Sequence, residues 1–206
     1  RGFSTRQVRG IQNDKVIFIS SASFQVPVDE EHFAIQADPT LLNIDPESLP
    51  SAAEALAGRD DAAARYWGTG RSFEMRHVPS PVYEGEVTDR SSHQGVWIKA
   101  FEPLPVSEDA TETANLHRIG LMYACDYTIL EGLLRQRGLT WSSEGLVTAS
   151  LDHSMWFYRV PNVDEWILYQ QDALSAQSQR GLAEGHFFDR DGNLLATVVQ
   201  EGMIRI

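Results

Sequence analysis

The stretch ETANLHRIGLMYACDYTILEGLLRQRG, residues 112–138, decides the fold because its apolar side chains recur at helical spacing. Gly138 follows the last periodic residue and is typical of a helix C-cap. We therefore predict one long helix over residues 112–137. Its periodic apolar positions are Leu116, Ile119, Tyr123, Leu130 and Leu134.

Strand-like runs flank this helix on both sides. Residues 2–8 and 15–25 predict a hairpin joined by the turn residues Gln12-Asn13-Asp14. Further strands are predicted over residues 72–78, 95–101, 147–159, 165–188 (long and bent) and 193–205. The last two are joined by Asp189-Arg190-Asp191-Gly192, a strong hairpin signal. The pattern indicates an α+β fold.

The chain divides into three parts by composition. Residues 1–27 hold the first hairpin, residues 28–70 form an acidic linker with short helices near 51–57 and 62–67, and residues 71–206 hold the long helix. Arg1-Gly2-Phe3 and Arg180-Gly181-Leu182 each precede a strand, a turn and an apolar strand. This weak repeat indicates two related units, of which the first lacks the helix.

Composition excludes several classes of protein. A net charge of −12 argues against nucleic-acid binding, which needs a concentrated basic face. A single cysteine excludes a disulfide framework, and no Cys/His cluster has metal-ligand spacing. No apolar run reaches the roughly 20 residues of a membrane span, and no secretory signal opens the chain. We expect a soluble protein from a reducing compartment.

Three lone polar residues stand within otherwise apolar elements: Asp126 in YACD, Ser150 in ASLDHSMWF and Gln200 in VVQEG. An unpaired buried polar group costs roughly 1–3 kcal/mol, so the three are expected to satisfy one another around one site. Structural roles stay open for Gln200 as a core amide and for Asp126 as a local backbone cap. Strand alternation directs Ser150 to the solvent side unless that face is covered.

At these residues the chain resembles the acyl-CoA thioesterase II family. The resemblance is carried by SLDHSMWFYR, DEWILYQQ and SAQSQRGLAEGHFFDRDGNLLATVVQEGMIR, while RGFSTRQVRGIQNDKVIFISSASFQ is similar to the end of that family's N-terminal half. It implies a double hotdog, in which a curved antiparallel sheet wraps a long helix and two copies are fused. Residues 1–27 would be the final strands of a truncated first copy, and residues 71–206 the second copy.

The resemblance further implies hydrolysis of fatty acyl-CoA to fatty acid and CoA without a metal or organic cofactor. Its catalytic Asp, Ser or Thr, and Gln correspond to Asp126, Ser150 and Gln200. A water oriented by these groups would attack the thioester, with Asp126 as general base. This route is preferred over an acyl-serine, because alternation places His153 on the face opposite Ser150. His153, Arg159 and Arg180 are candidate substrate-binding residues, the arginines for CoA phosphates.

Other prominent residues have plainer interpretations. Cys125 is interpreted as a small core residue, and Trp97, Trp156 and Trp166 as core aromatics. Surface or interface ion pairs stay open for both arginines. A hotdog hydratase or dehydratase acting on enoyl- or hydroxyacyl-CoA, or a non-catalytic acyl-CoA-binding half, are the alternative functions.

Partners and location follow from the same pattern. The missing first-copy helix predicts that a separate or absent N-terminal hotdog segment completes the pocket. Exposed sheet edges favour a homo-oligomer. The ending Ile204-Arg205-Ile206 differs from a peroxisomal Ser-Lys-Leu ending and favours a cytoplasmic protein of lipid metabolism.

Overall fold

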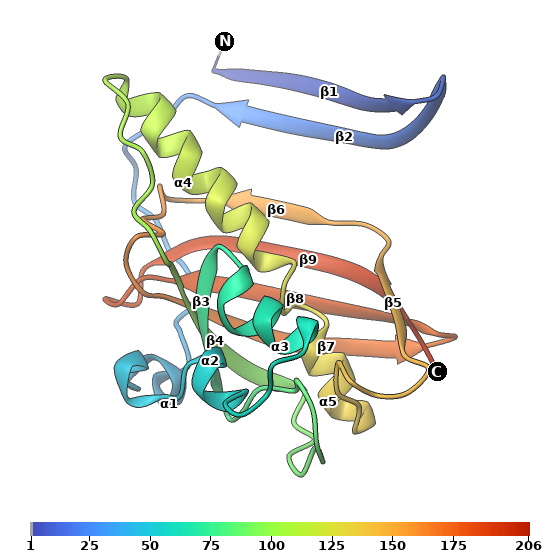
Figure 1. The fold of residues 1–206 in the computed structure, drawn as a ribbon. Helices are drawn as coiled ribbons and strands as arrows, with labels where there is room; N and C mark the ends of the chain where they lie inside the picture. Colours follow the sequence, from blue (N-terminus) through green and yellow to red (C-terminus); the bar gives the residue numbers. More distant parts are fainter. Residues whose placement is uncertain (1) are drawn as a thin grey trace. The chain divides into compact units, whose positions relative to one another are not determined.

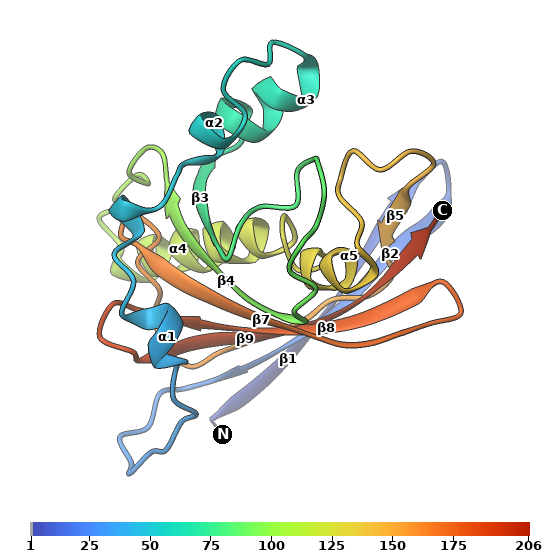
Figure 2. The same cartoon turned by 90° about the horizontal axis from the view of Figure 1, so that it is seen from below.

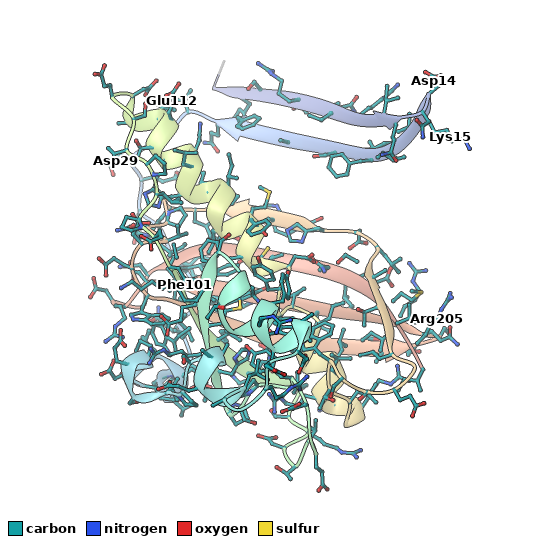
Figure 3. The ribbon with its side chains drawn as sticks, in the orientation of Figure 1. Asp14, Lys15, Asp29, Phe101, Glu112 and Arg205 are labelled. Carbon is teal, nitrogen blue, oxygen red and sulfur yellow. The ribbon has the colours of Figure 1, made fainter. Side chains whose placement is uncertain are left out.

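A computed structural model describes residues 2–206, so the Arg1 end of the predicted repeat lies outside it. The chain separates between Phe33 and Ala34 into two compact units. The first unit is an antiparallel hairpin of β1 (Phe3–Gln12) and β2 (Lys15–Gln25). Asn13 and Asp14 form its turn at φ 48° and 59°, in the left-handed region that Asn and Asp tolerate. Asp14 and Lys15 mark its tip in Figure 3, and the predicted hairpin is confirmed.

A seven-stranded antiparallel sheet dominates the second unit (Figure 1). Its path runs β3-β4-β7-β8-β9-β5, and β6 also pairs with β9. The strands are β3 (Phe73–Val78), β4 (His93–Ala100), β5 (Val147–Ser150), β6 (Ser154–Phe157), β7 (Ile167–Gln177), β8 (Arg180–Phe188) and β9 (Leu194–Arg205). Strands β5 and β6 therefore lie one after the other along the same edge of β9.

Two of the predicted strands are each divided in the structure. Residues 147–159 form β5 and β6 rather than one strand, because the N–H groups of Leu151 and Asp152 both donate to the Glu201 carbonyl and break the ladder. Residues 165–188 form the hairpin β7–β8 rather than one bent strand. Its turn holds Ser178 and Gln179 at φ 51° and 64°, residues that give little sequence signal for such a turn.

The predicted long helix is also divided. Helix α4 (Ala110–Cys125) begins at Asp109, whose side chain accepts from the Thr111 N–H at 2.7 Å. Helix α5 (Glu131–Arg137) ends at Gly138 with φ 69°, as predicted for a C-cap. Between them, the Tyr169 hydroxyl donates to the Cys125 carbonyl (3.2 Å). The Gln171 amide likewise donates to the Thr128 hydroxyl (2.6 Å). Side chains of β7 thus stabilise the turn that interrupts the helix.

Helices cover both faces of the curved sheet, with α4 and α5 on one face and α1 (Pro39–Leu42) on the other (Figure 2). Strand β4 shows the alternation: Val96 and Ile98 join the main core, while Trp97 joins the cluster beside α1. The predicted core positions of Trp97 and Trp166 are confirmed. Trp156 is 51% exposed, so its prediction was wrong, because its neighbours in β6 occupy the core-facing positions.

Most of the acidic segment predicted over residues 28–70 belongs to the second unit, which begins at Ala34. After α1 it contains the 3₁₀ helix η1 (Pro46–Ser48), α2 (Ala52–Ala55), α3 (Ala62–Arg65) and the π-helix η2 (Tyr66–Gly70). Leu41 and Leu56 are buried within it, Leu41 against Trp97 and Leu168 of the sheet. No helix among the described residues is both long and apolar enough to cross a membrane.

Candidate active site

Asp126, Ser150 and Gln200 meet in the second unit. The Gln200 amide Nε2 lies 2.7 Å from Asp126 Oδ1 and 2.9 Å from Ser150 Oγ, and Ser150 Oγ lies 2.9 Å from the same Asp126 oxygen. Each member therefore contacts the other two. The predicted convergence of three lone polar side chains is what the structure shows.

Three elements deliver these side chains. Asp126 caps the C-terminal end of α4, Ser150 is the last residue of β5, and Gln200 lies in the middle of β9. Ser150 stands opposite Gly202 in the β5–β9 ladder, two residues from Gln200. Gln200 is fully buried, with Val198 and Ile204 on the same apolar face of β9. Its amide must find partners there, and Asp126 and Ser150 supply them.

The hydrogens of the trio are fully assigned by these contacts. A carboxylate only accepts, so the Ser150 hydroxyl donates its hydrogen to Asp126 Oδ1. The two amide hydrogens of Gln200 go to Asp126 Oδ1 and to Ser150 Oγ. Both bonds to the carboxylate end on Oδ1. The second oxygen, Oδ2, accepts no hydrogen bond from the described residues and belongs to an exposed side chain.

Ser150 is exposed, but the alternation that directed it to the solvent face is wrong. It stands opposite Gly202, and opposed residues share a face, so Ser150 lies on the same face of the sheet as Gln200. From that face it reaches Asp126. Asp126 is exposed too, whereas Gln200 is buried beneath them. The site is therefore open to solvent at Asp126 and Ser150, and the buried Gln200 lies beneath these two side chains.

His153 is the candidate substrate-binding residue that the fold brings to the trio. Its Nδ1 lies 2.6 Å from Gln200 Oε1, and its Nε2 lies 3.6 Å from the Cys125 thiol. The alternation that placed His153 opposite Ser150 does not apply, because residues 151–153 lie in the break between β5 and β6.

The fold does not bring the two candidate arginines to the trio. The Arg159 backbone N–H donates to the Leu195 carbonyl (3.2 Å), five residues along β9 from Gln200. Arg180 begins β8 and forms an ion pair with Glu201, the neighbour of Gln200 on the alternate face of β9. Cys125 is fully buried, as predicted, and burial together with Asp126 raises the pKa of its thiol.

A second polar cluster, missed from the sequence, supports the turn that carries Asp126. Fully buried Glu131 accepts from the Trp141 indole N–H (2.9 Å) and lies 3.0 Å from His77 Nε2. Gln94 donates to Gln171 (2.8 Å), which in turn donates to Thr128 of the turn. Glu131 is a lone charged residue in an apolar run, so part of the signal that selected the trio was present here, whereas Gln171 is flanked by Gln170 and Asp172.

Electrostatics keep the Glu131 carboxylate ionised. Burial alone raises the pKa of Glu131, but the facing His77 and the Trp141 hydrogen bond outweigh it, so the pKa lies below its usual value. Among residues 2–206, no group of three His, Cys, Asp or Glu side chains is arranged to hold a metal ion.

A hotdog arrangement is defined by this fold, and comparison with known proteins agrees. A conserved protein with a hot dog fold from Alicyclobacillus acidocaldarius aligns over the whole chain with a TM-score of 0.74, at 14% identity and over 69% of its own length. Acyl-CoA thioesterase II TesB2 from Mycobacterium marinum aligns over the whole chain and 69% of its own, with a TM-score of 0.73 and 31% identity.

The sequence comparisons give the family. The acyl-CoA thioesterase family model matches residues 69–203. The chain is 30% identical over its whole length to acyl-CoA thioesterase 2 of Haemophilus influenzae, covering 70% of that protein. It is 31% identical over 98% of its length to acyl-coenzyme A thioesterase 8 of Rattus norvegicus, covering 63% of that protein. The chain belongs to the acyl-CoA thioesterase family, which is a family of thioester hydrolases.

Proposed function

We propose that this chain hydrolyses fatty acyl-CoA to free fatty acid and CoA, with water as the nucleophile and Asp126 as the general base. The observation that carries the proposal is the unequal use of the Asp126 oxygens. Oδ1 accepts from both Ser150 and Gln200, while Oδ2 is left for a water molecule. The two donors hold the carboxylate in one orientation, which is the geometric requirement for general-base catalysis.

The reaction balances with these groups alone. Asp126 takes a proton from the water as its oxygen bonds to the thioester carbon, and the carbonyl electron pair moves to oxygen. When that intermediate collapses, the C–S bond breaks and the CoA sulfur takes the proton from Asp126. Ser150 and Gln200 keep their hydrogen bonds to Oδ1 throughout and serve as orienting groups.

Water is favoured over Ser150 as the nucleophile. The Ser150 oxygen already accepts from Gln200 while its hydrogen is bound to Asp126. Attack by Ser150 would give up one of these bonds. His153, the base that an acyl-serine route would recruit, contacts Gln200 instead.

Release of free thiol from a short-to-long series of saturated acyl-CoA substrates tests the proposal. We expect Asp126→Asn to lower kcat by about 10²–10⁴-fold, the usual contribution of a positioned general base. The matched control is Asp60→Asn, at an exposed position away from the site. Equal release by wild type and Asp126→Asn would contradict the assignment. A hydratase would release no thiol from saturated substrates, and a binding half would be stabilised by ligand without turnover.

We propose Arg159 and Arg180 as the contacts of the CoA phosphates. Arg159 is anchored five residues from Gln200 on β9, roughly 16 Å along a strand, and Arg180 lies opposite Met203. Such separations suit a long substrate such as acyl-CoA, whose phosphates lie far from the thioester that reaches Asp126. The net charge of −12 gives no general attraction for an anionic substrate, so local cations are needed. Alanine at either arginine should raise KM and leave kcat nearly unchanged.

We propose that another hotdog copy covers the open site, as a second copy of this chain or as an N-terminal hotdog segment. Exposed apolar side chains adjoin Asp126 and Ser150 in the chain: Met122 (45%), Tyr123 (57%) and Leu151 (49%). Exposed apolar patches of this kind mark interaction surfaces. Light scattering of the purified protein should give a mass above the 23.1 kDa of one chain. Tyr123→Lys should return that mass toward one chain.

We place this activity in the cytoplasm, and the state of the single cysteine supports a reducing compartment. Cys125 is a free, buried thiol. Fractionation of cells that express the tagged protein tests the location.

A further inference from the structure

We propose that His153 is a positioning residue, which fixes the orientation of the Gln200 amide and so sets the alignment of Asp126. This inference rests on the proposed function, because it concerns the same site. The resemblance to known thioesterases gives His153 no such role, and the sequence pattern placed it among substrate contacts. Its hydrogen bond to Gln200 carries the inference.

A glutamine amide has a donor end and an acceptor end of nearly the same shape. In the observed orientation, Gln200 Nε2 faces Asp126 Oδ1 at 2.7 Å and Ser150 Oγ at 2.9 Å. Rotated by half a turn, the amide would direct its oxygen at the carboxylate oxygen, so two acceptors would face each other. In the observed orientation the amide nitrogen donates a hydrogen bond to Asp126, and in the rotated orientation the amide oxygen would repel the carboxylate.

His153 selects the productive orientation. Gln200 Oε1 accepts only, so the His153 Nδ1 at 2.6 Å must carry a proton and donate it. In the rotated amide, that N–H would face an NH₂ group and lose its bond. His153 thus stabilises the orientation in which Gln200 donates to Asp126 and Ser150.

The position of His153 is set by the break between β5 and β6. The Leu151 N–H donates to the Glu201 carbonyl (2.8 Å), and the Asp152 side chain accepts from the Glu201 N–H (2.9 Å). These two bonds fasten the preceding residues to the neighbour of Gln200. On its other side, His153 Nε2 lies 3.6 Å from Cys125, which precedes Asp126. His153 therefore lies between β9, which carries Gln200, and the end of α4, where Asp126 follows Cys125.

A double-mutant cycle tests this role. We expect His153→Ala to lower kcat about tenfold with little change in KM, as expected for loss of one short hydrogen bond. Gln200→Ala should lower kcat by at least as much. In the double variant, His153→Ala should cause no further loss, because its effect passes only through Gln200. His153→Asn, whose amide can still donate, should recover part of the rate.

Controls separate positioning from folding and from substrate contact. His186→Ala removes another histidine bonded to β9, through Thr197 at 3.0 Å, and should leave kcat unchanged. Thermal unfolding checks that each variant folds. A raised KM at unchanged kcat would make His153 a substrate contact, and an equal further loss in the Gln200→Ala background would make it independent. Either result, or no effect, overturns the proposal.

A measurement other than activity distinguishes the positioning role of His153 from the general-base role of Asp126. In ¹⁵N NMR spectra, the side-chain NH₂ of Gln200 should show slowed hydrogen exchange in wild type and fast exchange in His153→Ala. Unchanged exchange would overturn the positioning role even if hydrolysis fell. Failure of the proposed function would instead appear as full activity of Asp126→Asn.

Discussion

Gln200 and Asp126 stand 74 residues apart in the chain, and a 2.7 Å hydrogen bond from the amide to the carboxylate joins them. One partner is a buried strand residue and the other lies exposed at a helix end. The bond therefore ties an accessible carboxylate, the proposed general base, to a buried strand. The orientation of Asp126 thus depends on β9 as well as on the local turn.

The hydroxyl at position 150 should matter more than the serine itself. Ser150→Ala removes a hydrogen bond to a charged group, a type of bond worth about 1.5–3 kcal/mol, and should lower kcat by about 10–100-fold. Ser150→Thr keeps the hydroxyl and adds a β-branch that suits a strand, so it should retain most activity. Steady-state thiol release by both variants checks this, and an inactive Thr variant with native stability would contradict it.

Tyr169 should affect both stability and rate. Its hydroxyl bonds the Cys125 carbonyl at the end of α4, one residue before Asp126. Burial raises the pKa of Tyr169, so the hydroxyl stays protonated and remains a donor. Tyr169→Phe should lower the free energy of unfolding by about 1 kcal/mol, and kcat should fall because the turn loosens. Urea unfolding and thiol release measure the two effects, and Tyr158→Phe at an exposed position is the control.

Cys125 should react slowly while the protein is folded. The thiolate is the reactive form, and burial together with Asp126 raises the pKa of this thiol. Alkylation by iodoacetamide at neutral pH should therefore be slow in the native protein and fast in urea. Fast native labelling that abolishes hydrolysis would support a cysteine nucleophile instead.

Glu131 should make stability depend on acid pH. Burial raises its pKa, but His77 and Trp141 lower it below its usual value, so the folded state binds this proton more weakly than the unfolded chain. The contribution is present above the unfolded pKa of about 4.3 and is lost as pH falls through the lower folded value. Glu131→Gln should flatten the loss of stability in that acidic range.

The same substitution should lower stability near neutral pH by about 1.5–3 kcal/mol, because the buried Trp141 N–H loses a charged hydrogen-bond acceptor. Denaturation followed from neutral to acid pH measures both effects. Glu102→Gln, at an exposed position, is the matched control. An unchanged pH profile in Glu131→Gln would show that another group governs acid unfolding.

Local signals predicted the elements that local chemistry controls. A few adjacent residues are enough to specify each of three such features: the Asn13-Asp14 turn, the Gly138 cap and the Asp189–Gly192 turn. The break after Cys125 was not predictable in this way, because Tyr169 and Gln171 of a distant strand stabilise it. The β7–β8 turn uses Ser178 and Gln179 in left-handed backbone, which sequence rules assign to glycine or asparagine.

The convergence of Asp126, Ser150 and Gln200 was predicted because each is a lone polar residue in an apolar element. Their catalytic roles were assigned from the resemblance to the thioesterase family and stay a prediction. The contact of His153 was missed because strand alternation was extended past Ser150, where β5 ends. Glu131 was missed because a charged residue within a predicted long helix was taken as solvent-facing, although Glu131 is fully buried.

The register of β9 has a consequence for folding quality. A slip by one residue would place Val199 or Glu201 where Gln200 stands, and Glu201 would set a second carboxylate beside Asp126. The same slip would bring a side chain to the place of Gly202, where even a Cβ would lie 2.7 Å from Leu130. Either slip would take the Gln200 amide away from Asp126, so we expect turnover to report the fraction of protein with the correct β9 register.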